Sequence, residues 1–181
     1  MKCRVLGALF LAMGVATGVA AQEECPVGKP KVLLSAISPV VGAGPIWATT
    51  GSATVDWVDA EKPVGVLWVR DLAITGPAIL TGQLQGKPDV KVLFAERGST
   101  LGVKQPKFTL TGLGLKPPKA SLADVQKYAF HQTDVWFPST GCYEITGRVG
   151  KTPATLYLQV EVKKEPVKPA AKAAAKPATK K

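Results

Sequence analysis

The strongest constraint on the fold is an alternation of apolar and polar residues near the end of the chain. Four apolar side chains occupy every second position there: Leu156, Leu158, Val160 and Val162. The positions between them hold Thr155, Tyr157, Gln159 and Glu161. Successive side chains of a strand point to opposite faces, so this segment predicts a strand with one buried and one wet face. Such strands are typical of antiparallel sheets that face water on one side.

The preceding segment, 142–149, predicts the partner of that strand. Its apolar or small residues again share one face: Tyr143, Ile145, Gly147 and Val149. Residues 150–153, Gly-Lys-Thr-Pro, separate the two segments and are suited to a turn. The end of the folded part is therefore predicted to be a β-hairpin.

Comparable strand-like runs recur along the chain between clusters of Gly, Pro, Asp and Lys. The predicted strands are 31–37, 52–58, 64–70, 78–85, 89–95, 107–111, 133–137, 142–149 and 154–162. Turns at such short intervals indicate an all-β sandwich. One short helix is predicted within 121–130, because Ser121 is suited to cap its N-terminus and Asp124 falls in its first turn.

The first residues have the pattern of a secretory signal peptide. Lys2 and Arg4 precede the nearly apolar run 5–19, and small residues allow cleavage after Ala21. The alternative is an N-terminal membrane anchor, although the run is short for a membrane span and lacks a charged flank. The protein is therefore expected to be exported, to the periplasm, the cell surface or the medium. Residues 22–162 are the predicted single domain, with no membrane segment after cleavage.

The formal net charge of +10 is concentrated at the C-terminus. Residues 163–181 contain Glu165 and seven lysines: Lys163, Lys164, Lys168, Lys172, Lys176, Lys180 and Lys181. Alanines and prolines fill the remaining positions, so this segment is predicted to be a disordered basic tail. Spaced ammonium groups on a flexible chain bind polyanions in a salt-dependent way. The tail is therefore a candidate polyanion contact or, equally, a solvated spacer.

Two of the three cysteines, Cys25 and Cys142, remain after the predicted cleavage. An even pair in an oxidising compartment favours a disulfide, and two unpaired thiols are the alternative. In the chain-entropy model, a bond that closes a loop of this length contributes up to about 4–5 kcal/mol of stability.

The run 135–147, Val-Trp-Phe-Pro-Ser-Thr-Gly-Cys-Tyr-Glu-Ile-Thr-Gly, resembles a motif of uncharacterised secreted bacterial proteins, W-F-P-x-x-G-C-W/Y-E-V/I-T-G. Cys25-Pro26 is similar to the Cys-Pro pair near the mature N-terminus of those proteins, and residues 66–82 resemble their central region. The resemblance covers most of residues 25–162 and implies an immunoglobulin-like β-sandwich with a disulfide from the N-terminus to the hairpin. It implies no particular activity. Antibody domains place a tyrosine two residues before a strand cysteine, whereas Tyr143 follows Cys142 here.

No set of catalytic residues stands out, so neither an enzyme nor a cofactor or metal is expected. His131 is the sole histidine, and its neighbours suggest a strand edge or loop and a surface or half-buried side chain. A Ser-His-Asp arrangement with Asp134 lacks a Gly-x-Ser-x-Gly elbow. Cys142 is better explained by a disulfide than as a nucleophile. The acidic group Asp56, Asp59 and Glu61 fits no calcium loop, and 112–114 (Gly-Leu-Gly) lacks the context of a phosphate loop.

Four tryptophans stand out in a domain of this size. Trp57, Trp68 and Trp136 lie in strand-like runs and are expected to pack in the core. Trp47 follows Gly44-Pro45-Ile46 and is the candidate ligand platform for a glycan or peptide.

The function that these observations predict is that of an exported, noncatalytic immunoglobulin-like module of the bacterial envelope. It would bind an envelope protein or glycan, with its tail on polyanions. Two alternatives remain: a small secreted hydrolase that uses His131, and an accessory subunit of an exported complex to which edge strands would add.

Overall fold

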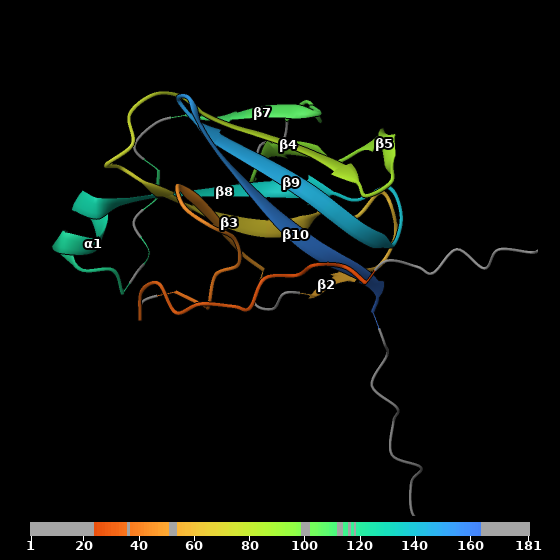
Figure 1. Ribbon diagram of the computed structural model, residues 1–181, viewed down its shortest axis with the longest axis horizontal. Coiled ribbons are helices and arrows are strands. Elements are labelled where there is room, and N and C mark those ends of the chain that lie inside the picture. Colours follow the sequence, from red (N-terminus) through yellow and green to blue (C-terminus); the bar gives the residue numbers. More distant parts are fainter. Residues whose placement is uncertain are drawn as a thin grey trace, which may run out of the picture.

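The computed structural model describes residues 24–35, 37–50, 54–98, 102–111, 114–115, 117 and 119–163. Ten strands and one helix occur in this part of the chain (Figure 1). The strands are β1 (Ile46–Thr49), β2 (Thr54–Trp57), β3 (Val64–Asp71), β4 (Ala78–Leu84), β5 (Lys87–Lys91), β6 (Leu93–Glu96), β7 (Lys107–Leu110), β8 (Tyr128–Trp136), β9 (Gly141–Val149) and β10 (Thr152–Val162). The helix is α1 (Leu122–Lys127). The predicted signal peptide and the tail beyond Lys163 lie outside the described residues.

The strands form two sheets that pack face to face. One sheet has the order β1-β3-β8-β6, and the other has the order β2-β10-β9-β4-β5, with β7 also paired to β4. The first sheet has four strands, and the last two strands and β4 form the centre of the second. This is the arrangement of an immunoglobulin domain. The predicted all-β, immunoglobulin-like sandwich is therefore confirmed.

One strand pair departs from the predicted antiparallel arrangement. β2 pairs with β10 in parallel, with Thr54 opposite Gln159 and Trp57 opposite Val162. A tight hairpin forces its two strands to be antiparallel, but β2 and β10 are joined by most of the domain. The pairing is extended by the amide of Lys163, which donates to the carbonyl of Trp57 at 2.9 Å.

The strand predicted at 31–37 is wrong. Among the described residues of this run, Lys31 makes one isolated bridge to Val40, with two backbone hydrogen bonds of 2.8 Å. Its apolar side chains pack onto a sheet instead of entering one. Leu33, Leu34 and Ile37 lie against a cluster on the outer face of the four-stranded sheet, and Val32 points to solvent.

The strand predicted at 89–95 is divided. β5 belongs to the six-stranded sheet and β6 to the four-stranded one, so the chain changes sheets at Val92. The side chain of Val92 is fully buried, and its amide donates to the carbonyl of Gly82 at 2.9 Å. The sequence does not reveal such a crossing, because both halves of the segment look like strands.

The helix begins as predicted but ends earlier. Ser121 caps its N-terminus, and the side chain of Asp124 accepts a hydrogen bond from the amide of Ser121 in a capping box. Residues 128–130, predicted as helix, open β8. Tyr128, Ala129 and Phe130 are all buried, since both faces of this part of the sheet are covered. A strand buried on both faces loses the alternation by which it is recognised.

The core lies between the sheets. Its largest fully buried side chains are Trp68, Tyr143, Phe94, Phe137, Ile46, Leu80 and Ile145. The inward positions predicted on the hairpin are confirmed from Tyr143 to Val149 and from Leu156 to Val160. Val162, assigned to the same face, is 61 % exposed because it lies at the edge of the domain, where β10 ends.

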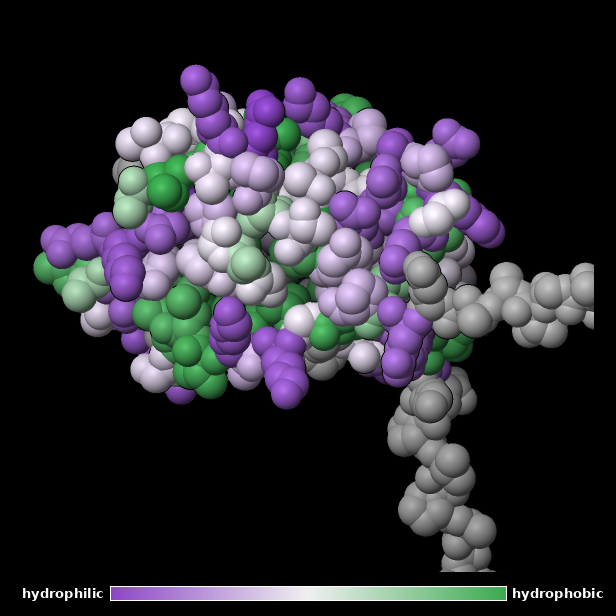
Figure 2. Space-filling view, viewed as in Figure 1, coloured by the Kyte–Doolittle hydropathy of each residue, from purple (hydrophilic) through white to green (hydrophobic). Residues whose placement is uncertain are grey.

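A second apolar cluster covers the outer face of the four-stranded sheet. Val40, Val69, Tyr128 and Phe130 form its buried part, beneath the segment that contains Leu33 and Leu34. Figure 1 shows this N-terminal segment crossing the lower side of the domain, and Figure 2 shows hydrophobic atoms gathered at the lower left of that view. The face over β9 and β10 is mostly polar in the same view.

Candidate functional site

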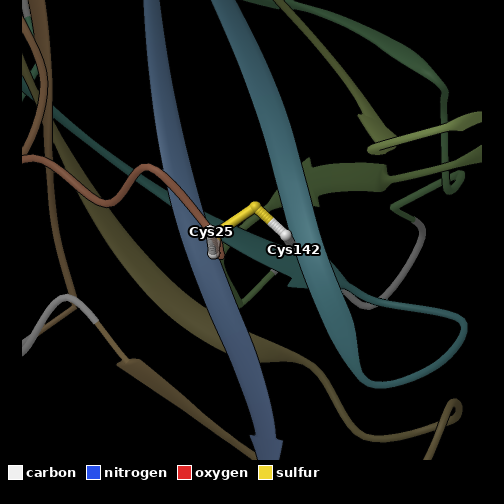
Figure 3. The surroundings of a disulfide bond; sticks show 2 residues. All are labelled: Cys25 and Cys142. Atoms are coloured by element: carbon white, nitrogen blue, oxygen red, sulfur yellow. A yellow bond between two sulfur atoms is a disulfide. The ribbon is translucent and has the colours of Figure 1, made fainter. Parts of the chain in front are cut away.

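A disulfide joins Cys25 to Cys142, with 5.4 Å between their Cα atoms. Figure 3 shows it connecting the N-terminal segment to β9. Cys142 stands opposite Gln159 of β10, so the bond ties the first described residues to the C-terminal hairpin. The sulfur of Cys142 is thereby withdrawn from nucleophilic chemistry.

His131 lies inside β8, neither at a sheet edge nor in a loop. It stands opposite Trp68 of β3 and is only 6 % exposed, so the expected surface or half-buried position is wrong. Its Nε2 atom is buried and has no hydrogen-bond partner in the structure. Buried polar side-chain atoms usually have such a partner, which makes this nitrogen a candidate ligand contact.

A cavity of about 460 Å³ adjoins His131. It opens between the two sheets, where β7 of one sheet approaches β8 of the other. Its lining residues come from β6 and the turn after it, β7, β8 and the segment between β7 and α1: Glu96, Arg97, Phe108, Leu110, Thr111, Gly114, Leu115, Phe130, His131, Gln132 and Thr133. This volume falls within the range of about 300–1,000 Å³ found for small-molecule sites.

The cavity has an apolar and a polar side. Phe108 and Leu110 belong to the edge of the core, and Leu115 is half exposed. On the polar side, the hydroxyl of Thr133 accepts a hydrogen bond of 2.8 Å from the indole of Trp68. A surface with apolar walls and a few placed polar groups is typical of ligand-binding pockets.

The electrostatics of this region act on His131. Burial lowers the pKa of its imidazole below the usual 6.5, and the positive charge of Arg70 lowers it further. Arg70 is two residues beyond Trp68 on β3, so it occupies the same face of the sheet as His131. Both effects favour the neutral imidazole, which can donate through one nitrogen and accept through the other.

The arrangement for a Ser-His-Asp hydrolase with Asp134 is absent among the described residues. Asp134 is three residues from His131 on the same strand and therefore lies on the opposite face of the sheet. Its carboxylate pairs with Arg97 at 4.0 Å instead. The guanidinium of Arg97 lies over Gly65, in the space that a Cβ at this position would occupy.

Of the acidic group, Asp56 lies in β2, whereas Asp59 and Glu61 lie in the connection between β2 and β3. The carboxylate of Asp59 accepts hydrogen bonds from the amides of Glu61 and Lys62, at 2.9 and 3.0 Å. Glu61 pairs with Lys104 at 3.2 Å. Throughout the described part of the chain, no three His, Cys, Asp or Glu residues gather as metal ligands would. Residues 112 and 113 of the glycine run lie outside it.

The tryptophans have different surroundings. Trp68 is fully buried in the core. Trp57 is half-buried, packs against the core cluster and donates a hydrogen bond to the carbonyl of Phe137 at 2.9 Å. Trp136 is half-buried outside both apolar clusters, with Lys104 Nζ 4.9 Å from the centroid of its ring, so its predicted core position is wrong. Its place on β8 puts it on the outer face, opposite the side occupied by Val135.

Trp47, the predicted platform, lies in β1 on the outer face of the four-stranded sheet. Its ring meets Tyr128 edge to face, with 6.0 Å between centroids, and it packs against the second cluster. It lines neither the cavity beside His131 nor the cavity formed by β4, β9 and residues 106 and 107. A role for Trp47 in ligand binding stays a prediction.

Of the lysines predicted to contact polyanions, the structure describes Lys163 alone, at the end of β10. Lys164, Lys168, Lys172, Lys176, Lys180 and Lys181 lie outside the described residues. A polyanion contact by the tail stays a prediction.

Comparison with models of protein families, with curated proteins and with solved structures finds no match to this chain. The resemblance to uncharacterised secreted bacterial proteins therefore stays a prediction, and the cavity must be interpreted from its own residues.

The sequence did not reveal the cavity, because its residues come from distant segments and look ordinary individually. The sequence shows His131 as a lone histidine, but its surroundings depend on β7, which pairs with β4 through Leu110 and Ala78. One local signal was present: the aromatic run Tyr128-Ala129-Phe130 directly before His131 favours a buried strand.

Proposed function

We propose that the domain is an exported, noncatalytic immunoglobulin-like module that binds a small ligand in the cavity between β7 and β8. The observation that supports this proposal most is the unpartnered, buried Nε2 of His131 beside a cavity of about 460 Å³. A rigid sandwich can hold such a site in place without a moving part, because β8 pairs with strands on both sides.

The surroundings of His131 favour binding over catalysis. Nucleophilic catalysis needs a hydroxyl or thiol within reach of a base. The hydroxyl of Thr133 is engaged by Trp68, and the sulfur of Cys142 is bonded to Cys25. Asp134, which would orient the imidazole in a triad, lies on the opposite face of β8.

Export is supported by two independent features. The first residues have the pattern of a signal peptide, and the Cys25–Cys142 disulfide is typical of oxidising compartments. Among the described residues, no helix has the length and apolar character needed to cross a membrane. The envelope is the proposed location, where a small ligand or the end of a larger one would occupy the cavity.

The proposal can be tested through the imidazole of His131, because the chain contains a single histidine. Monosaccharides, dipeptides, benzoate, benzamide and benzylamine are added at millimolar concentration, and the ¹H–¹³C signals of the imidazole ring are followed. At least one class is expected to shift them. If none does, the cavity is not a small-ligand site and the proposal fails.

Two matched variants show whether a shift arises in the cavity. Thr111→Trp places a large ring at the mouth of the cavity, where Thr111 is exposed. Thr109→Trp makes the same change at an exposed position of β7 that does not line it. Binding is expected to be lost in the first variant and kept in the second. Equal binding by both would place the ligand elsewhere.

A further inference from the structure

We propose that the outer face of the six-stranded sheet binds an uncharged oligosaccharide, over a second cavity that is separate from the one beside His131. This inference does not depend on the proposed function. It rests on three features: an opening at the edge of β4, two rows of polar side chains that cross the strands there, and the mixture of donors, acceptors and charges in those rows.

The opening arises because two strands share one edge of β4. β7 pairs with residues 78–81, and β5 pairs with Gln83 and Leu84. Pro106, directly before β7, has no backbone N–H with which to extend the first pairing. The cavity between the two strands has a volume of about 310 Å³. Its polar lining consists of Thr81, Gln83, Lys91, Lys107, Glu144 and Thr146.

The strand registers place these polar side chains in two rows across the sheet. The first row consists of Lys91, Gln83, Glu144 and Tyr157. The second row consists of Lys107, Thr81, Thr146 and Thr155. Both rows lie on the outer face, because Ile145 and Leu156, which separate them on β9 and β10, are buried in the core.

The dimensions of the rows suit an elongated ligand. Neighbouring strands lie about 4.8 Å apart, so a row of four side chains spans about 14 Å. The cavity underlies the part of each row over β4 and β9, and Tyr157 continues the first row as a half-buried aromatic ring on β10. Figure 2 shows a mostly polar surface over β9 and β10. An oligosaccharide could occupy the cavity with one sugar and extend its neighbours toward Tyr157.

The rows offer hydrogen-bond donors and acceptors together. The ammonium groups of Lys91 and Lys107 donate, the carboxylate of Glu144 accepts, and the amide of Gln83 and the threonine hydroxyls do both. Lys91 Nζ donates to Gln83 Oε1 at 3.1 Å. No described residue forms a hydrogen bond or an ion pair with the carboxylate of Glu144. Each hydroxyl of a saccharide can donate and accept, so a saccharide matches this mixture.

The charges favour an uncharged ligand. The strands of this sheet carry four positive side chains, those of Lys87, Lys91, Lys107 and Arg148. They carry as many acidic ones, those of Asp56, Asp89, Glu144 and Glu161. In the cavity, Glu144 is half-buried and both lysines are exposed. An anion there would lie against a carboxylate, and a cation would be repelled by two ammonium groups.

The cavity also lacks an apolar wall. Among the described residues, Pro106 supplies the one apolar side chain of its lining. The burial of apolar surface, which drives the binding of hydrophobic ligands, would therefore contribute little. A ligand that is rich in hydroxyl groups and carries no charge meets all these conditions, and saccharides are the class of biological molecule with that composition.

The experiment measures the binding of tetrasaccharides to the protein by calorimetry. The uncharged probes are cellotetraose, maltotetraose and N-acetylated chitotetraose, and the charged probes are deacetylated chitotetraose and tetragalacturonate. A high salt concentration keeps the lysine tail from attracting the anionic probe. At least one uncharged probe is expected to bind, at least about tenfold more tightly than either charged one. If no uncharged probe binds, or if a charged probe binds most tightly, the inference is wrong.

Two matched variants locate the binding. Glu144→Leu removes the carboxylate within the first row and is expected to weaken binding at least about tenfold. Glu161→Leu makes the same change at an exposed position of β10 outside the cavity and should keep the wild-type affinity. Thr146→Val removes one hydroxyl, keeps the shape and strand tendency of the residue, and should also weaken binding. Unfolding temperatures show that the variants fold. Equal binding by Glu144→Leu and Glu161→Leu would overturn the inference.

The imidazole of His131 separates this site from the proposed one. The outer face of the sheet lies away from the cavity between the sheets, so a bound tetrasaccharide should leave the signals of His131 unchanged. A saccharide that shifts these signals and binds equally to Glu144→Leu occupies the cavity beside His131. That result would overturn this inference and support the proposed function. If no small ligand binds beside His131, the expected result with the tetrasaccharides is unchanged.

Discussion

The hydroxyl of Tyr143 is bound to both backbone groups of Ser139. It donates to the carbonyl at 3.0 Å and receives a hydrogen bond from the amide at 3.2 Å. Tyr143 is fully buried on β9, and its ring meets Phe137 edge to face with 4.9 Å between centroids. A hydroxyl that returns to the backbone a few residues upstream is the tyrosine corner of immunoglobulin-like domains. The antibody spacing, with the tyrosine two residues before the cysteine, is absent as expected, because Tyr143 follows Cys142.

Tyr143→Phe is therefore expected to destabilise the domain. The ring would stay in the core, but both backbone groups of Ser139 would lose a partner, at a cost of about 1–2 kcal/mol in the free energy of unfolding. Urea denaturation measures this difference. Tyr157→Phe, on the half-buried outward face of β10, is the control and should change stability by less than about 0.5 kcal/mol. Equal effects of the two changes would contradict the assigned role.

The disulfide is expected to contribute strongly to stability. It links residues 117 positions apart, and the chain-entropy model gives about 4–5 kcal/mol for a loop of that length. Cys25→Ser combined with Cys142→Ser should lower the free energy of unfolding by up to this amount. Unfolding of the wild-type protein in urea with a reductant should match that of the double variant. A wild-type protein indifferent to reductant would show that the bond does not form.

Two glycines with positive φ allow steric contact to be separated from backbone strain. Gly150 has φ +58°, and an added Cβ would lie 2.6 Å from the carbonyl oxygen of Thr75. Gly86 has φ +74° and open space around it. Gly86→Ala should cost about 1–2 kcal/mol, the usual penalty of this conformation. Gly150→Ala should cost at least about 1 kcal/mol more, because backbone must move. Equal shifts in the unfolding temperature of the two variants would contradict the close approach of Gly150 to the carbonyl of Thr75.

Acidification is expected to destabilise the domain through His131. Its pKa is lower in the folded state than the 6.5 of an exposed histidine, so the unfolded chain binds more protons as the pH falls below that value. The stability that the neutral imidazole contributes is therefore fully present above pH 6.5 and is lost as the pH falls below that value. The free energy of unfolding should fall between about pH 7.5 and pH 5.5, and by less in His131→Gln. An identical pH profile in the variant would show that His131 does not titrate differently on folding.

The basic tail is expected to bind polyanions in a salt-dependent way if it acts as predicted. Affinity for double-stranded DNA, used as the probe, should fall with salt at a logarithmic slope of about 0.9 per phosphate neutralised. Removal of residues 164–181 should abolish this binding and leave the fold intact, because Lys163 still pairs with Trp57. A full-length variant with glutamine at the tail lysines beyond Lys163 controls for length. Unchanged binding by either form would show that the tail is a spacer.

The sequence predicted those parts of the fold whose signals are local. Residues 142–149 and 154–162 alternate because each strand has one face in the core, and Ser121 and Asp124 cap a helix within one turn. The cysteine pair could be anticipated because an exported chain with two cysteines has few other uses for them. These features depend on neighbours along the chain or on composition.

The tertiary structure decided everything that depends on which strands meet. The run 31–37 resembles a strand but covers the outer face of a sheet, and residues 128–130 resemble a helix but are buried on both sides of β8. The surroundings of His131 likewise arise from β3, β7 and β8, which lie far apart in the sequence. Alternation determines which side of a strand is apolar. It does not determine what packs against that side, because this requires the free energy of long-range contacts that no local pattern contains.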